Sequence, residues 1–244
     1  MNTKALKELV KQFNCLMLNG ASSECLDELA EQIQRYNMSA YDIQTPFIAR
    51  RNRITDFELE KWERISELVP PSKNTKLFEM AFGSGRDLLI AKNLGYDVYG
   101  CELSNYLYMN FLAEFKFDSN KIIQSDIRNI PFCDNSFDLI RHNASFLHMP
   151  IIGPGYTVHK CLEESYRLLT KNGCLYIFTK EGQGFETIDT LDGLGKRSFQ
   201  LYTEKTLKEL LHDCGFAVTE FNHYNRERNG KRILWIEAFA YKND

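Results

Sequence analysis

From residue 76 onward, short apolar runs alternate with segments of helical periodicity, and this alternation constrains the fold most strongly. Strands are predicted at 75–81, 97–103, 121–126, 137–143, 174–180, 217–225 and 232–241, and helices at 85–95, 104–116, 158–170 and 203–215. Such alternation predicts an α/β fold with a seven-stranded, mostly parallel, Rossmann-like sheet and helices on both faces.

The connection between the last two predicted strands is short. It contains Asn229-Gly230, a dipeptide typical of tight β-hairpins. We therefore expect the last strand to run antiparallel to its neighbours.

The first 70 residues predict helices instead of alternation. Apolar residues recur at helical spacing over 3–35, with a break at Asn19-Gly20, and another helix begins after Thr55. Residues 37–54 are rich in turn-forming residues. We expect 1–70 to be a helical lid or cap that belongs to the same domain as the α/β part at 71–244. It would cover an open sheet edge, a ligand pocket or both.

Composition limits the partners and the compartment. The chain has 244 residues, 43% of them hydrophobic, and a net charge of -3, so no basic surplus draws it to nucleic acid or an anionic membrane. Seven scattered cysteines form no Cys-x-x-Cys pair, which predicts a reducing, cytoplasmic location without a zinc or redox site. The N-terminus lacks the uninterrupted apolar run of a signal peptide or membrane helix. A homodimer is compatible with these data.

The segment LFEMAFGSGRD, from Leu77 to Asp87, joins a predicted strand to a predicted helix. Gly83 and Gly85 permit positive φ and a close approach of a ligand to the backbone, and the helix N-terminus offers N–H donors. Ala81 stands where a further glycine is common, and we expect it to avoid positive φ. A Walker lysine is absent, which excludes a triphosphate loop, and Glu79 would repel a pyrophosphate but favour an amine.

Acidic residues also end the next two predicted strands. Glu102 is suited to accept both hydroxyls of a ribose, or else to cap a helix. Asp126 is suited to accept an adenine amino group beside the backbone of Ile127, or else to cap a turn. Since the carboxyl ends of parallel strands share one edge of a sheet, these groups should meet in one crevice.

The order E-x-A-x-G-S-G, an acid after the second strand, then SD-I and IPFCDNSFDLI, resembles class I S-adenosylmethionine-dependent methyltransferases. The resemblance covers about 75–244, including LTKNGCLYIF and the terminal hairpin, and is greatest to bacterial small-molecule enzymes without an assigned substrate. It implies S-adenosyl-L-methionine as cofactor, S-adenosyl-L-homocysteine as product, and no metal. The residues that it assigns to the cofactor are Glu79, Ala81, Gly83, Gly85, Arg86, Glu102, Leu103, Asp126, Ile127, Asn143 and Ala144.

Within this resemblance each residue has an expected contact. Glu79 would lie near the methionine amino end, Leu103 would pack on the adenine, and the backbone at Asn143 and Ala144 would meet the cofactor's amino group. Arg86 would reach the methionine carboxylate or simply lie in the first helical turn.

Transfer to a hydroxyl needs a general base, whereas transfer to a neutral amine needs one much less. His148, in ASFLHMP after the fourth strand, is the best candidate base, with a packed loop histidine as the alternative. Glu181 is a candidate for orienting the acceptor, or else a solvated charge. Substrate contacts are expected from Tyr36, Tyr41 and Phe47, and from Arg197 and Phe199 in the 182–202 insertion, which predicts a mobile binding loop.

The leading hypothesis is therefore methyl transfer to an oxygen or nitrogen of a small molecule, in a lidded pocket. A methyltransferase for RNA or protein is the first alternative, because two basic clusters could follow a nucleic-acid backbone; they comprise Arg50, Arg51 and Arg53, and Arg226, Arg228, Lys231 and Arg232. The second alternative is a non-catalytic S-adenosylmethionine-binding protein. A NAD-dependent dehydrogenase is disfavoured by Glu79 and the hairpin ending.

Overall fold

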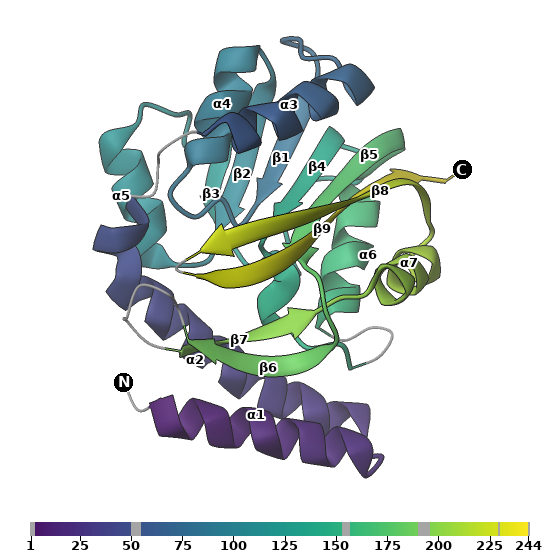
Figure 1. Cartoon of the computed structure of the whole chain (residues 1–244). Coiled ribbons are helices and arrows are strands. Elements are labelled where there is room, and N and C mark those ends of the chain that lie inside the picture. Colours follow the sequence, from purple (N-terminus) through teal and green to yellow (C-terminus); the bar gives the residue numbers. More distant parts are fainter. Residues whose placement is uncertain (1–2, 50–54, 153–156, 190–195, 229, 244) are drawn as a thin grey trace.

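A computed structural model describes residues 3–49, 55–152, 157–189, 196–228 and 230–243 (Figure 1). Its main sheet has seven strands in the order β3-β2-β1-β4-β5-β9-β8. The strands are β1 (Lys76–Met80), β2 (Asp97–Glu102), β3 (Ile122–Gln124), β4 (Phe137–Asn143), β5 (Leu169–Lys180), β8 (Phe216–Arg228) and β9 (Lys231–Lys242).

The direction of the strands confirms the predicted topology. Strands β3, β2, β1, β4 and β5 are paired in parallel. Strand β9 is antiparallel to both β5 and β8, so it enters the sheet between them in reverse. The fold is therefore Rossmann-like, with an antiparallel last strand.

Helices cover both faces of this sheet (Figure 1). On one face lie α3 (Asp56–Leu68), α4 (Arg86–Leu94) and α5 (Asn105–Glu114); on the other lie α6 (Val158–Leu168) and α7 (Glu204–Asp213). Neighbouring residues of β4 show the two layers, because Leu139 packs with the first group and Ile140 with the second. The sheet is thus buried on both faces, as parallel sheets are.

The 182–202 insertion, which we predicted to be a mobile binding loop, contains ordered strands instead. It contains a two-stranded antiparallel hairpin, β6 (Gly184–Asp189) and β7 (Lys196–Leu201). Phe185 is buried against Phe13 of α1 (Thr3–Leu18), with ring centroids 5.5 Å apart. The ladder and this apolar contact fix the hairpin.

The N-terminal helices confirm the break at Asn19-Gly20, but the turn expected from residue 37 is wrong. Helix α2 runs over Ser23–Ala49 without interruption. Asn37 explains the continuation: its amide nitrogen donates to Ser198 Oγ at 2.7 Å, and its amide oxygen accepts from the Ser198 backbone N–H at 3.0 Å. A contact 161 residues away in the sequence therefore extends the helix.

Among the described residues, no helix is long and apolar enough to cross a bilayer. Figure 1 shows α1 and α2 together with the β6–β7 hairpin at the end of the molecule to which the parallel strands point. The division at residue 70 into a cap and a methyltransferase domain stays a prediction.

Candidate active site

A cavity of about 390 Å³ lies at the carboxyl ends of β1, β2 and β4. Helix α2 covers it with Gln34, Asn37, Met38 and Tyr41. Its other walls come from α3, from the turn after β1 and the start of α4, from the loops after β2, β3 and β4, and from β5, β8 and β9. The lining residues of those walls include Ala81, Phe82, Gly83, Ser84, Arg86, Glu102, Leu103, Asp126, Ile127, Asn143, Ala144, Ser145, His148, Phe178, Arg226 and Trp235.

The turn after β1 has a conformation that corrects one expectation. Ala81 adopts φ +57°, the left-handed region that we expected it to avoid. Gly83 and Gly85 also have positive φ, at +60° and +81°. A Cβ on Gly85 would lie 2.1 Å from Phe111 Cε2, so only glycine fits there. The backbone of the turn therefore has left-handed φ angles at Ala81 as well as at the two glycines.

Glu102 is fixed by the backbone of the cavity wall. Its Oε2 accepts the Gly83 N–H at 2.8 Å, and its Oε1 accepts the Ser104 N–H at 2.9 Å. The residue is 6% exposed and lines the cavity. Two backbone N–H groups therefore hold its carboxylate in place on the cavity wall, where Leu103 also lies.

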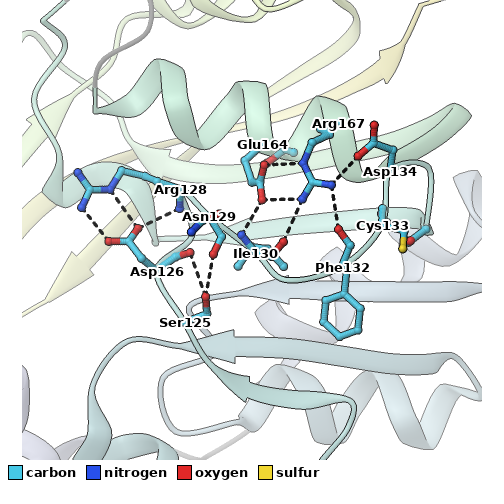
Figure 2. A network of polar contacts seen from close by, with 12 residues as sticks. Ser125, Asp126, Arg128, Asn129, Ile130, Phe132, Cys133, Asp134, Glu164 and Arg167 are labelled. Carbon is cyan, nitrogen blue, oxygen red and sulfur yellow. Dashed lines mark hydrogen bonds and ion pairs between the residues drawn. The ribbon is translucent and has the colours of Figure 1, made fainter.

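The loop after β3 is held by two arginines, which Figure 2 shows. Asp126 accepts three hydrogen bonds from Arg128: the backbone N–H at 2.9 Å, Nε at 3.0 Å and Nη2 at 2.7 Å. Arg167 donates to the carbonyls of Ile130 and Phe132 further along the loop. Burial opposes ionisation of Asp126, but the bonds and charge of Arg128 hold the pKa of this carboxyl below its usual range. Asp126 and Ile127 are thereby kept on the cavity wall.

A buried charge cluster supports the cavity from behind. Glu79 is 2% exposed and forms an ion pair with Arg141, which also contacts Asp87 at 3.4 Å. Asp87 accepts hydrogen bonds from Trp62 Nε1 at 3.1 Å and from Asn143 Nδ2 at 3.0 Å. Complete burial raises the pKa of Glu79 to about 7 in spite of the ion pair. Glu79 is not among the residues that line the cavity, and its contact with the methionine end of the cofactor stays a prediction.

Cationic side chains gather near the glycine turn. Arg86 lines the cavity and pairs with Asp87 at 3.0 Å and Glu58 at 3.4 Å. Lys61 of α3 also lines it, with Nζ 3.8 Å from the centroid of the Phe178 ring. Burial is the main cause that lowers the pKa of Lys61 to about 8. We did not predict Lys61, because in the sequence it is simply one charge in a polar helix.

Tyr41 and His148 form a hydrogen-bonded pair on the cavity wall, with Tyr41 Oη 2.7 Å from His148 Nε2. His148 Nδ1 lies 2.8 Å from the carbonyl oxygen of Ser198, which can only accept, so Nδ1 carries the proton. Burial, and then the charge of Arg197, lower the pKa of His148 to about 3, so the ring is neutral. Nε2 therefore accepts the hydroxyl proton of Tyr41.

The remaining predicted contacts lie further from the cavity. Arg197 and Phe199 of β7 are buried behind the pair, with the Arg197 guanidinium carbon 4.7 Å from the centroid of the Tyr41 ring. Tyr36 packs against the α1–α2 core. Glu181 follows β5, lies 3.1 Å from His223 Nδ1 and is not among the lining residues. The side chain of Phe47 falls outside the described residues.

Of the two basic clusters, the structure describes only the one that contains Arg226. Arg226 turns inward: it lines the cavity, and its guanidinium lies 4.2 Å from the centroid of the Phe57 ring and 3.9 Å from Glu58. Residues 50–54 fall outside the described ranges. Within those ranges, no group of three or more His, Cys, Asp or Glu side chains could hold a metal ion.

Comparison with known proteins agrees with this geometry. The family model described as a methyltransferase domain matches residues 78–177. A phosphoethanolamine N-methyltransferase from Plasmodium falciparum is 26% identical over 175 residues, which are 70% of this chain and 64% of that protein. This chain thus matches less than two thirds of the length of that relative.

Two solved structures show the same fold. A S-adenosylmethionine-dependent methyltransferase from Methanosarcina mazei superposes with a TM-score of 0.64 at 18% identity, over 74% of this chain and 97% of that one. A 1,6-didemethyltoxoflavin-N1-methyltransferase from Burkholderia thailandensis, solved with its substrate and S-adenosylhomocysteine, gives a TM-score of 0.61 at 17% identity, over 88% of both chains. Residues 78–177 thus match a methyltransferase domain, and the chain has the fold of S-adenosylmethionine-dependent methyltransferases.

Proposed function

We propose that the protein transfers a methyl group from S-adenosylmethionine to a nitrogen or oxygen of a small molecule, by in-line displacement in the cavity beneath α2. The arrangement of this cavity carries the proposal. Glu102 and Asp126 lie on one part of its wall, whereas Tyr41 of α2 and His148 lie on another. One cavity thus combines groups for an adenosine with a separate polar site for an acceptor.

The side chains present fit the cofactor. Glu102, already oriented by two backbone N–H groups, would accept the ribose hydroxyls. Leu103 would pack on the adenine, and Asp126 and Ile127 would meet its edge. Gly83, which has open space beside its Cα, leaves room for a ligand against the backbone.

The amino-acid end of the cofactor would lie toward the cationic side of the cavity. Arg86 and Lys61 would attract its carboxylate, since Lys61 has no carboxylate within ion-pair distance in the described structure. The backbone at Asn143 and Ala144 would accept from its ammonium group. Asp87 would position Asn143 through the 3.0 Å hydrogen bond.

When bound, S-adenosylmethionine supplies a methyl group activated by the positive sulfur. The protein then has to orient the acceptor and exclude water. His148 cannot meet the acceptor directly through Nε2, because Tyr41 occupies that nitrogen. We therefore assign the acceptor contact to the Tyr41 oxygen, with His148 fixing its hydroxyl proton and Arg197 and Phe199 supporting the pair. Glu181 has no part in this mechanism.

Two relatives support a small acceptor. By their names, the Plasmodium relative acts on phosphoethanolamine and the Burkholderia neighbour on 1,6-didemethyltoxoflavin, both small molecules. An RNA acceptor would instead need an exposed basic strip, and Arg226 contributes to the cavity. A cytoplasmic location and a homodimer stay predictions, which cell fractionation and size-exclusion chromatography would test.

Calorimetric titration of the full chain with S-adenosylmethionine, S-adenosylhomocysteine and NAD tests the cofactor. We expect both adenosyl compounds to bind and NAD not to bind. The proposal fails if neither adenosyl compound binds with a dissociation constant below about 1 mM, which corresponds to a binding free energy of roughly -4 kcal/mol. A screen of small molecules, with transfer RNA and a protein extract as competing acceptors, then reads the release of S-adenosylhomocysteine.

A further inference from the structure

Ser145 lines the cavity directly after β4, and a chain of buried hydrogen bonds runs behind it. Its Oγ lies 2.8 Å from His142 Nδ1, and His142 Nε2 lies 2.9 Å from Ser165 Oγ. Ser165 in turn donates to the carbonyl oxygen of Cys161 at 2.8 Å. His142 and Ser165 are both completely buried.

The chain has only one consistent direction. The Cys161 carbonyl can only accept, so it takes the single proton of Ser165. The Ser165 oxygen must then accept from His142 Nε2, which leaves an unprotonated Nδ1 on the neutral ring. Burial lowers the pKa of His142 to about 3, which keeps the ring neutral. Nδ1 therefore accepts the proton of Ser145, and the Ser145 oxygen can offer only lone pairs to the cavity.

Tyr41 presents the same chemistry through the opposite tautomer. Its proton is committed to His148 Nε2, while His148 Nδ1 donates to the Ser198 carbonyl. Tyr41 Oη and Ser145 Oγ are thus both hydrogen-bond acceptors on the wall of one cavity. Both chains end at a backbone carbonyl instead of a carboxylate, so neither can stabilise a proton taken from a substrate.

We infer that Ser145 is a specificity-determining residue, which accepts a hydrogen bond from an N–H of the methyl acceptor and, together with Tyr41, selects a neutral primary amine. This inference rests on the proposed function. An –NH₂ group has two hydrogens for two acceptor oxygens, whereas an alcohol has one.

The transfer itself also favours an amine. The nitrogen lone pair forms the new C–N bond, while the C–S bond breaks and its electron pair stays on sulfur. The positive charge moves from sulfur to nitrogen, and the product ammonium loses its extra proton to water after release. An alcohol would have to lose its proton at a site that has no base to hold it.

Long-range ¹H–¹⁵N spectra of the histidine rings test the direction of the chain without any ligand. We expect His142 to be protonated at Nε2 and His148 at Nδ1. Ser145→Ala should move the His142 resonances alone, and Tyr41→Phe those of His148 alone. Ser136→Ala, which removes an exposed hydroxyl bonded to a backbone carbonyl, is the control and should move neither. A His142 ring protonated at Nδ1 would overturn the inference, because the Ser145 proton would then be available to the cavity.

Methyl transfer to matched pairs of probes tests the selection: benzylamine against benzyl alcohol, and ethanolamine against ethylene glycol. We expect the amines to be methylated in preference to the alcohols. Ser145→Ala should lower kcat/KM for the amine about 10- to 100-fold, with the dissociation constant of S-adenosylmethionine changed less than about 2-fold. A thermal unfolding midpoint near that of the wild type shows that the variant is folded.

Two results would contradict this selection: preferred methylation of an alcohol, or a Ser145→Ala variant with weaker cofactor binding and unchanged kcat/KM for the amine. Failure of the wild type to bind S-adenosylmethionine would instead defeat the proposed function. The histidine spectra would still report on Ser145 in that case.

Discussion

At the scale of single residues, Glu102 has the most direct predicted effect on cofactor binding. Glu102→Ala removes the proposed acceptor for two ribose hydroxyls and releases the N–H groups of Gly83 and Ser104. We expect S-adenosylmethionine to bind more weakly by about 1–3 kcal/mol, measured by calorimetric titration. Glu114→Ala, at the exposed end of α5, is the control. Equal affinity in wild type and Glu102→Ala would show that the ribose lies elsewhere.

Ala81 gives a prediction about stability. An alanine at φ +57° is strained by roughly 1–2 kcal/mol relative to its ordinary conformations, whereas glycine adopts this angle freely. The greater entropy of glycine in the unfolded chain offsets part of this relief of strain. Ala81→Gly should therefore raise the free energy of unfolding by no more than about 1 kcal/mol.

Urea unfolding measures this difference. The same substitution at Ala113, which lies within α5, should lower the stability by about 1 kcal/mol, so the two variants move in opposite directions. A loss of stability at both sites would mean that Ala81 is not strained.

His148 makes stability depend on pH. Its pKa is lowered to about 3 in the folded protein, against about 6.5 when unfolded. Below pH 6.5 the unfolded chain therefore binds a proton that the folded chain does not, and stability falls as the pH falls toward 3.

Between pH 7.5 and 5.5 this residue alone should lower the wild-type stability by about 1.4 kcal/mol. The His148→Asn variant, less stable at every pH, should lack this part of the loss. Urea unfolding of both proteins at the two pH values gives the comparison, and an identical loss in both would contradict the prediction.

At the scale of elements, the junction between α2 and the β6–β7 hairpin holds the cover of the cavity. Asn37→Ala leaves the buried Ser198 N–H and hydroxyl without their α2 partner. We expect a loss of about 1–3 kcal/mol in the free energy of unfolding and faster amide exchange in β7.

The control for this junction is Ser39→Ala, also in α2, which removes an exposed hydroxyl bonded to the Arg35 carbonyl. It should change stability by less than about 0.5 kcal/mol. Unaltered exchange in β7 of the Asn37→Ala variant would show that other contacts, such as Phe13 with Phe185, hold the hairpin without Asn37.

At the scale of the whole molecule, the sheet and its ligand-binding edge could be predicted because each depends on local patterns. Short apolar runs indicate the strands, and Glu102 and Asp126 stand at the ends of two of them. Parallel pairing then brings these ends to one edge without further information. Eleven of the predicted site residues line one cavity, whereas Glu79, Gly85 and the residues predicted in the 182–202 insertion do not. The eleven are Ala81, Gly83, Arg86, Glu102, Leu103, Asp126, Ile127, Asn143, Ala144, His148 and Tyr41.

What could not be predicted depends on contacts between distant segments. The continuation of α2 past residue 37 depends on Ser198, and the hairpin is fixed partly by α1. In the sequence His142 is simply a residue of a predicted strand; its contacts with Ser145 and Ser165 depend on the fold. Lys61 faces the cavity only because α3 packs on β4 and β5. The apolar periodicity of a single segment cannot predict these contacts between distant segments.

The two backbone hydrogen bonds to the Glu102 carboxylate affect how a ligand binds in the cavity. Because its carboxylate already joins the turn after β1 to the start of α5, both loops are shaped before any nucleoside arrives. Their conformational entropy is lost when the chain folds, so little of the binding free energy is consumed in ordering them. We therefore expect the cofactor to bind at this wall without a rearrangement of the two loops.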